Sequence, residues 1–211
     1  MTFFEGETNQ SNFVIGFSKT SLSDFGVYAK GYTRAADRLA IALIEAPRFS
    51  DYEAYPVCFL YRHALELSLK QIVSDSTRLA TFTFKEEVYS VLQSCHNLEK
   101  LAETVERLLV KYFPNDVDLH EFADRIRISC KEISALDQRS ESFRYPVNKR
   151  GIATVDHHQI INLEAFARHL SSLLEELEVV HLGLDIETFK AEEIYAIIHS
   201  VLGTESRQDL E

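Results

Sequence analysis

The sequence predicts an all-α fold, an antiparallel bundle of about five to six helices around a central apolar helix. Apolar side chains recur at steps of three and four residues along most of the chain, which is the periodicity of amphipathic helices. Glycine and proline are few, 7 and 4 among 211 residues, whereas a fold of many tight turns needs more of both. The breaks between the periodic segments are polar and mostly short, which favours antiparallel neighbours.

The chain is predicted to form one domain. Residues 1–20 have no helical period and hold Asn, Ser, Thr and Gly, so we expect an extended arm there. Residues 21–203 carry the bundle, and a chain of this length with 45% hydrophobic residues can bury a core without a disulfide or a metal. Residues 204–211 predict a disordered tail.

The first helix is expected to run from Ser21 to about Ala46. Ser21 followed by Asp24 is a helix-start signal, and Pro47 moves the residue before it out of helical geometry. One apolar stripe is predicted to face the core, and it consists of Phe25, Tyr28, Tyr32, Ala35, Leu39 and Leu43.

The second helix is expected to be the central one. It is predicted to begin near Asp51, with Pro56 tolerated in its first turn. From Val57 to Ile72 it is apolar almost all round, which is typical of a helix surrounded by others.

One polar line interrupts this helix. Arg62, Glu66 and Lys70 are spaced four residues apart with His63 beside them, and Glu66 before Lys70 is the favourable order for an ion pair. A charge on a buried helix is costly unless it is paired or reaches solvent. We expect Arg62 to pair with Glu66 as a structural brace; the alternative is that Arg62 lies in a polar pocket and contacts phosphate or a loop.

The rest of the chain predicts further helices. Residues 78–95 are ambiguous, with a short strand at 81–84 and a short helix at 85–93 as one interpretation. A short hairpin within residues 140–159 is also left open. Four more helices are expected: from the Asn97 cap to Tyr112, from about Asp118 to Leu136, from Ile161 to about Gly183, and a shorter one from Asp185 to about Val201.

Charge and cysteine usage restrict the class of protein. The net charge is −11, but ten acids and two bases after residue 174 account for −8 of it. This acidity argues against broad nucleic-acid binding. RNA remains a possible partner, but the net charge does not support it. Cys58, Cys95 and Cys130 lie far apart and form no CxxC pair, so we expect free thiols and no zinc ribbon.

Targeting and cofactor signals are also lacking. The first residues do not form a signal peptide, and no stretch approaches the ~20 apolar residues of a membrane span, so we expect a cytoplasmic protein without membrane contact. Glu178 and His181 form a single ExxH, whereas a di-iron site needs two. No phosphate-binding glycine motif, GxSxG or HExxH occurs, so we expect no cofactor and no metal.

The most informative segment lies between the fourth and fifth of these predicted helices, and we call residues 140–159 the basic loop. Long structureless segments in compact domains are usually functional or disordered. Arginine can bind phosphate with a planar fork of donors, and histidine can move a proton near neutral pH. The bases of this region are Arg139, Arg144, Lys149 and Arg150, and the histidines are His157 and His158.

Three phrases carry a resemblance to a known family. FLYRHALELSLKQI (residues 59–72), HNLEKL (96–101) and FRYP (143–146) resemble bacterial members of the HEPN superfamily over roughly residues 21–182. The resemblance implies a helical bundle that commonly forms a homodimer. Many such proteins are metal-independent ribonucleases in toxin–antitoxin, phage-defence and CRISPR systems, and others are non-catalytic.

The family's catalytic motif is Arg, about four to six residues, then His. Only Arg150 and His157 match this spacing, with six residues between them, and Gly151 follows the arginine where the family usually has a polar residue. If the chain is an enzyme, we expect Arg144 and Arg150 to hold phosphate and His157 to act as general acid or base, in a site that two copies could share. The residues expected around it as a binding pocket are Arg62, His63, His96 and Tyr145.

Two functions remain. The sequence favours a non-catalytic interaction module in a bacterial defence or toxin–antitoxin type system, a homodimer that binds a protein partner. The alternative is a metal-independent endoribonuclease that uses Arg and His residues of the basic loop. A ribonuclease needs an arginine and a histidine at one groove, whereas an interaction module needs only an exposed apolar or charged face.

Overall fold

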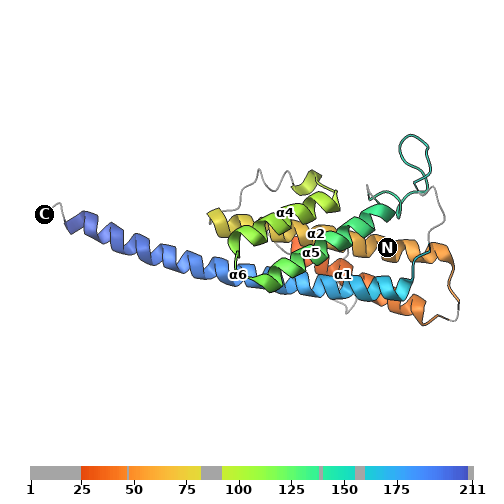
Figure 1. Ribbon diagram of the computed structural model, residues 1–211, viewed down its shortest axis with the longest axis horizontal. Helices are drawn as coiled ribbons and strands as arrows, with labels where there is room; N and C mark the ends of the chain where they lie inside the picture. Colours follow the sequence, from red (N-terminus) through yellow and green to blue (C-terminus); the bar gives the residue numbers. More distant parts are fainter. Residues whose placement is uncertain (1–24, 47, 82–91, 138–139, 155–159, 209–211) are drawn as a thin grey trace, which may run out of the picture.

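The structure is a computed structural model that describes residues 25–46, 48–81, 92–137, 140–154 and 160–208, with 201–208 described by their backbone only. Within these ranges the chain is helical, and the all-α prediction is confirmed (Figure 1). The helices are α1 (Phe25–Ile44), α2 (Ala54–Thr81) after a short 3₁₀ turn (Asp51–Glu53), α4 (Leu98–Tyr112), α5 (Val117–Leu136) and α6 (Leu163–Gln208).

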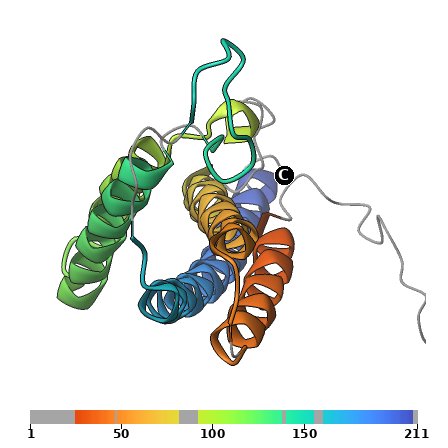
Figure 2. The same ribbon diagram turned by 90° about the vertical axis from the view of Figure 1, so that its right-hand side faces the viewer.

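Helix α2 is the centre of the bundle, as its apolar sequence predicted. It packs against α1, α4 and α6, and α5 packs against α4. Figure 2 looks along the bundle and shows α2 between α1 on one side and the α4–α5 pair on the other. Tyr61, Leu65, Leu69 and Ile72 of α2 are almost fully buried, because all sides of this part of the helix are covered.

The buried face of α1 differs from the predicted stripe. Tyr28 is 61% exposed and Ala35 is exposed, whereas the other members of the predicted stripe contact the core, with Leu43 buried and Phe25, Tyr32 and Leu39 partly buried. Most of the fully buried residues of α1 are alanines, and small side chains let two helices approach closely. The residues that α1 buries are Ala29, Ala36, Ala40 and Leu43.

The predicted boundaries hold best where a capping side chain is present. Asn97 caps α4, and its side chain accepts a hydrogen bond from the Lys100 amide at 3.0 Å. Helix α5 begins at Val117, close to the expected start, because Asp116 accepts from the Leu119 amide at 2.9 Å. Thr81 ends α2 and is not in a strand, residues 92–94 are helical, and the rest of the ambiguous 82–91 segment lies outside the described residues.

Helix α6 corrects the prediction of two helices separated near Gly183. It is one helix of 46 residues, and Gly183 lies inside it with open space where a side chain would be. A helical glycine costs about 1 kcal/mol relative to alanine. Leu184 and Thr188, which are 2% and 1% exposed, offset this cost because they bury side chains just past the glycine.

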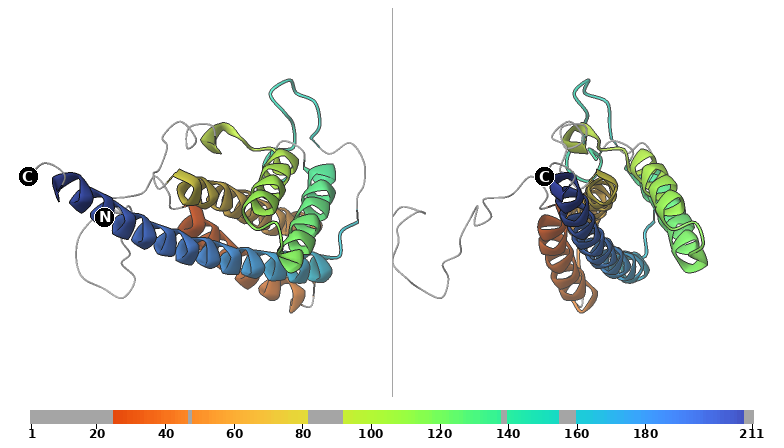
Figure 3. Two further views of the ribbon diagram at one scale, coloured as in Figure 1. Left: turned by 60° about the vertical axis from the view of Figure 1, so that its left-hand side comes forward. Right: turned by 90° about the vertical axis from the view of Figure 1, so that its left-hand side faces the viewer.

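The C-terminal half of α6 extends beyond the other helices (Figure 1, Figure 3). It continues to Gln208, past Thr204, where the sequence predicts the tail to begin. The predicted arm at residues 1–20 lies outside the described residues. No helix in the described ranges combines the length and the apolarity needed to cross a lipid bilayer.

The continuity of α6 predicts opposite effects for two substitutions at one site. Gly183→Ala should raise the free energy of unfolding by about 1 kcal/mol, whereas Gly183→Pro should lower it by ~3 kcal/mol because it breaks the helix interior. Chemical denaturation and far-UV circular dichroism measure both effects. Gly31→Ala, which also meets no atom within 4 Å, is the matched control and should stabilise similarly. Tolerance of the proline would instead indicate a break between two helices.

Candidate functional site

A cluster of buried charges lies where α2 meets the start of α4 and the end of α5. Arg62, Glu66 and Lys70 are 0%, 1% and 2% exposed. Arg62 Nη1 lies 3.1 Å from Glu66 Oε2, and Lys70 Nζ lies 2.8 Å from Glu66 Oε1. The predicted Arg62–Glu66 pair is therefore confirmed. We call these three residues, together with His96 and Asp137, the charge cluster.

Arg62 joins three segments of the chain through its other nitrogen atoms. Its Nη2 donates to the main-chain oxygen of His96 at 3.0 Å. Its Nε donates to the main-chain oxygen of Asp137 at 3.3 Å and lies 3.4 Å from Asp137 Oδ2. Because the guanidinium is fully buried and surrounded by protein oxygens, its role is to hold the cluster together.

Asp137 fixes the start of the basic loop. Its Oδ1 accepts hydrogen bonds from the amides of Glu141 and Ser142, at 2.8 and 3.0 Å. Ser140 adopts a positive φ of 60°, and its carbonyl accepts from Arg144 Nε at 2.6 Å. This role of Asp137 is not visible in the sequence, because a position after a helix end does not show that the residue is buried.

The middle of the basic loop forms a tight turn that agrees with the short hairpin left open above. Val147 and Ala153 form an isolated antiparallel bridge. The Asn148 amide donates to Ile152 O at 2.8 Å, and Gly151 takes a φ of 73°, which glycine adopts readily.

His63 and Arg144 are linked through aromatic rings. The His63 ring stacks on Phe59, with centroids 5.6 Å apart and planes 9° apart, and meets the edge of Tyr32 at 4.6 Å. The Arg144 guanidinium lies over Phe59 at 5.5 Å and over Tyr145 at 5.4 Å from the ring centres. The structure thus brings the predicted pocket residues His63 and Tyr145 to one side of Arg144.

The surroundings keep His63 neutral near pH 7. Burial is the main reason that its pKa lies below 6.5. The charge of Glu66 opposes this shift, and the positive charges of Lys70, Arg62 and Arg144 reinforce it.

His96 lies at the solvent edge of the charge cluster. Its Nδ1 is 2.9 Å from Glu66 Oε1, and its side chain is 59% exposed while that of Glu66 is 1% exposed. Burial alone would raise the pKa of Glu66, but hydrogen bonds and charge from Lys70, and then from His96, lower it below its usual value. The buried carboxylate is therefore ionised and holds an exposed imidazole by one nitrogen.

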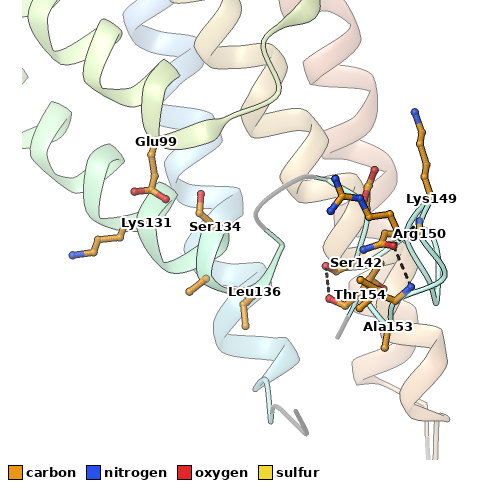
Figure 4. Close-up of a pocket in the computed structure, with 13 residues that line it drawn as sticks. Glu99, Lys131, Ser134, Leu136, Ser142, Lys149, Arg150, Ala153 and Thr154 are labelled. Carbon is orange, nitrogen blue, oxygen red and sulfur yellow. Dashed lines mark hydrogen bonds between the residues drawn. The ribbon is translucent and has the colours of Figure 1, made fainter. Parts of the chain in front are cut away.

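A groove of about 860 Å³ lies between the end of α5 and the basic loop. The loop wall is closed by a hydrogen bond from Ser142 Oγ to Thr154 O at 3.1 Å, drawn dashed in Figure 4. Figure 4 shows Glu99, Lys131, Ser134 and Leu136 of the helices on one wall, and Ser142, Lys149, Arg150, Ala153 and Thr154 on the other.

The predicted catalytic residues take different places. Arg150 lines the groove, whereas Arg144 lies over aromatic rings of α2 and of the loop and is not among the groove-lining residues. His157 lies outside the described residues, so the expectation that it shares a site with Arg144 or Arg150 stays a prediction.

A second polar cluster joins α2 to α6. Asp75 Oδ2 lies 2.7 Å from His181 Nδ1, and Asp75 Oδ1 accepts from Gln71 Nε2 at 2.7 Å. Asp75, His181 and Asp185 are the one group in the described part of the chain whose donor atoms could surround a metal ion. Arg78 lies 3.8 Å from Asp185, and its positive charge opposes a bound cation. Hydrogen bonding between the helices accounts for this cluster.

Comparisons with known proteins do not assign the chain to a family. No family model matches it, and no match is found among curated proteins or solved structures. The resemblance to the HEPN superfamily therefore stays a prediction from the residues quoted above.

The Asp75–His181 pair predicts that stability falls as pH rises through the neutral range. The hydrogen bond that His181 Nδ1 donates to the Asp75 carboxylate is the main reason that the pKa of His181 lies above 6.5, with partial burial opposing it. A raised pKa in the folded state stabilises the fold below the unfolded value, and this stabilisation is lost as pH rises through the folded value.

Melting temperatures between about pH 6 and 8.5 measure this loss. In His181→Gln the melting temperature should fall less over this pH range than in the wild type. In His199→Gln, which changes another histidine of α6, it should fall as in the wild type. An identical pH profile for His181→Gln and the wild type would contradict the assignment.

Proposed function

We propose that this chain is a metal-independent endoribonuclease whose site combines the groove with the charge cluster beside it. The observation that supports the proposal is a concave surface lined by bases, together with the pair formed by the buried Glu66 carboxylate and the exposed His96 ring. Lys131, Lys149 and Arg150 line the groove. Glu99 also lines the groove and lies three residues after His96, which is itself not among the groove-lining residues.

The distribution of charge is compatible with an RNA substrate at this place. Most of the net negative charge follows residue 174, in α6 and the residues after it. The C-terminal end of α6 and the basic loop lie at opposite ends of the molecule (Figure 1). Arg144, Lys149 and Arg150 are exposed on the described part of the loop. The groove lining holds three bases and two acids, Glu99 and Glu141, and the acids of the distant end of α6 are screened beyond a Debye length of about 10 Å.

RNA supplies its own nucleophile, so such a site needs no metal. A 2′-hydroxyl attacks the adjacent phosphorus once a base removes its proton, and nearby cations stabilise the charge that develops on phosphate. Arg150 can hold the phosphate with a planar pair of donors. The histidines near the cluster can move the proton.

Cleavage of labelled single-stranded RNA and of total cellular RNA in EDTA tests the proposal. The wild type should cleave, and Lys149→Ala with Arg150→Ala should lower kcat/KM by at least ~10-fold, because each charge-assisted contact to phosphate contributes about 1.5–3 kcal/mol. Arg168→Ala removes an exposed base on α6 and is the matched control. A second pair, Arg144→Ala with His157→Ala, tests the residues that the sequence assigned. No cleavage by the wild type would exclude the proposal.

A second candidate, the non-catalytic interaction module, is supported by an apolar stripe on α6. Val179, Leu182, Ile186, Phe189 and Ile197 lie on one side of the helix and are each 53–68% exposed. With roughly 150–200 Å² of surface for each such side chain, they expose on the order of 500 Å². The exposed Lys190 and Glu193 lie on the same side of the helix, so the stripe is apolar from Val179 to Phe189 and mixed beyond it. Monomeric proteins rarely leave large apolar patches uncovered. We call these five residues the α6 stripe.

A second copy of this chain fits the α6 stripe. The stripe continues from the part of α6 that packs on the bundle into the part that projects beyond it. Antiparallel pairing of two copies would place Val179, Leu182 and Ile186 of one copy against Phe189 and Ile197 of the other. With the polar residues beside it, the surface approaches the ~800 Å² that each partner contributes to a standard interface.

Light scattering after size-exclusion chromatography tests this pairing. The wild type should be a dimer at micromolar concentration, and Ile186→Glu with Phe189→Glu should raise the dissociation constant more than ~100-fold, because it places unpaired carboxylates in an apolar interface. Ile128→Glu, at a residue of α5 that is 48% exposed, is the matched control and should stay dimeric. A wild type that is monomeric at about 0.1 mM would show that a second copy does not cover the stripe.

A further inference from the structure

We propose that His96 is the residue that removes the proton from the attacking hydroxyl, and that buried Glu66 positions it. The inference rests on the proposed endoribonuclease activity and names a catalytic residue that the sequence motif does not contain. The sequence assigned proton transfer to His157, seven residues after Arg150, and gave His96 only a place in the pocket.

The hydrogen bond between His96 and Glu66 fixes the tautomer of the imidazole. Glu66 is ionised and can only accept, so the Nδ1 of a neutral His96 must carry the proton and donate it to Oε1 across 2.9 Å. The Nε2 atom is then the basic one. Among the described residues none bonds to Nε2, and the side chain is 59% exposed, so a substrate hydroxyl can reach it.

The backbone of His96 is held as firmly as its ring. Its carbonyl oxygen accepts from the buried Arg62 guanidinium at 3.0 Å. The next residue, Asn97, caps α4 through the Lys100 amide. Glu66 is in turn held between Arg62 and Lys70, so the carboxylate cannot rotate away from His96 without losing its contacts to both buried cations.

Other described histidines are less suited to this role. The His63 ring is stacked on Phe59 and faces the edge of Tyr32, so its faces are covered. His169 Nε2 pairs with Ser129 Oγ at 2.8 Å, and His120 Nε2 pairs with a main-chain oxygen at 2.9 Å. His96 combines an ionised buried partner with an exposed second nitrogen.

The proposed step balances without a metal or a second reactant. Nε2 of His96 takes the proton from a ribose 2′-hydroxyl, and the 2′-oxygen forms a bond to the adjacent phosphorus. The bond from phosphorus to the 5′-oxygen breaks, and its electron pair stays on that oxygen, which takes a proton from water. The products are a 2′,3′-cyclic phosphate and a 5′-hydroxyl, and the imidazolium returns its proton to solvent.

Cleavage kinetics of His96→Ala test the assignment, on an end-labelled single-stranded RNA in EDTA. General-base removal should lower kcat about 10²- to 10⁴-fold. Added imidazole should restore part of the activity, which it would not do if His96 had only a structural role. The melting temperature should stay near that of the wild type because the side chain is more than half exposed. Glu66→Gln should lower kcat with little change in KM, since it disturbs the orientation of His96.

The control His199→Ala removes a histidine of α6 and should leave cleavage unchanged. If His96→Ala keeps wild-type activity while His157→Ala loses it, the role of His96 is wrong and the endoribonuclease proposal stands. If the wild type does not cleave, both proposals fail. Loss of activity in His96→Ala without rescue by imidazole, and with a lowered melting temperature, would also overturn the catalytic role and leave a structural one.

Discussion

The pairing of Glu66 with two buried cations is the constraint on which the site depends. Arg62 and Lys70 are almost completely removed from solvent on the same helix, and Glu66 contacts both of them. Removing one partner of such a group typically costs about 3–5 kcal/mol, whereas replacing all of it with apolar residues is often neutral or stabilising. Stability alone therefore does not explain why the most buried helix of the bundle carries these charges. The cluster also fixes the chain before α4 and after α5, because Arg62 binds the carbonyl of His96 and Asp137.

The same cluster couples the core to the loop. Arg62 contacts the carbonyl oxygen of His96, just before α4. It also contacts the main-chain oxygen and Oδ2 of Asp137, just after α5. Asp137 then binds two amides of the basic loop. Through this chain of contacts, the packing of α2 sets the position of His96 and of the loop wall of the groove. The groove thus has the ends of two helices as one wall and a loop fixed at its start as the other.

The features that the sequence predicts correctly are those that depend on interactions between residues close together in the chain. The Asn97 cap and the four-residue spacing of Arg62 and Glu66 depend on neighbours along the chain, so both could be found without a structure. At Gly183 the burial of Leu184 overrides a local break signal, so the two predicted helices are one. The core face of α1 was only partly predicted, because apolar residues occur around most of this helix and their spacing does not show which of them are buried. The buried state of Asp137 depends on Arg62, 75 residues earlier, and no local pattern contains that contact.

The geometry of α6 makes the two proposals independent of each other. A helix of 46 residues rises about 70 Å, and the basic loop lies near its first residue while the α6 stripe spans its middle, from Val179 to Ile197. Antiparallel pairing through the stripe would place the two loops at opposite ends of the dimer. A catalytic site shared across such an interface is then sterically excluded, and each copy must supply its own arginine, carboxylate and histidine. The charge cluster meets that requirement within one chain, because Glu66 and His96 come from adjacent segments of the same bundle.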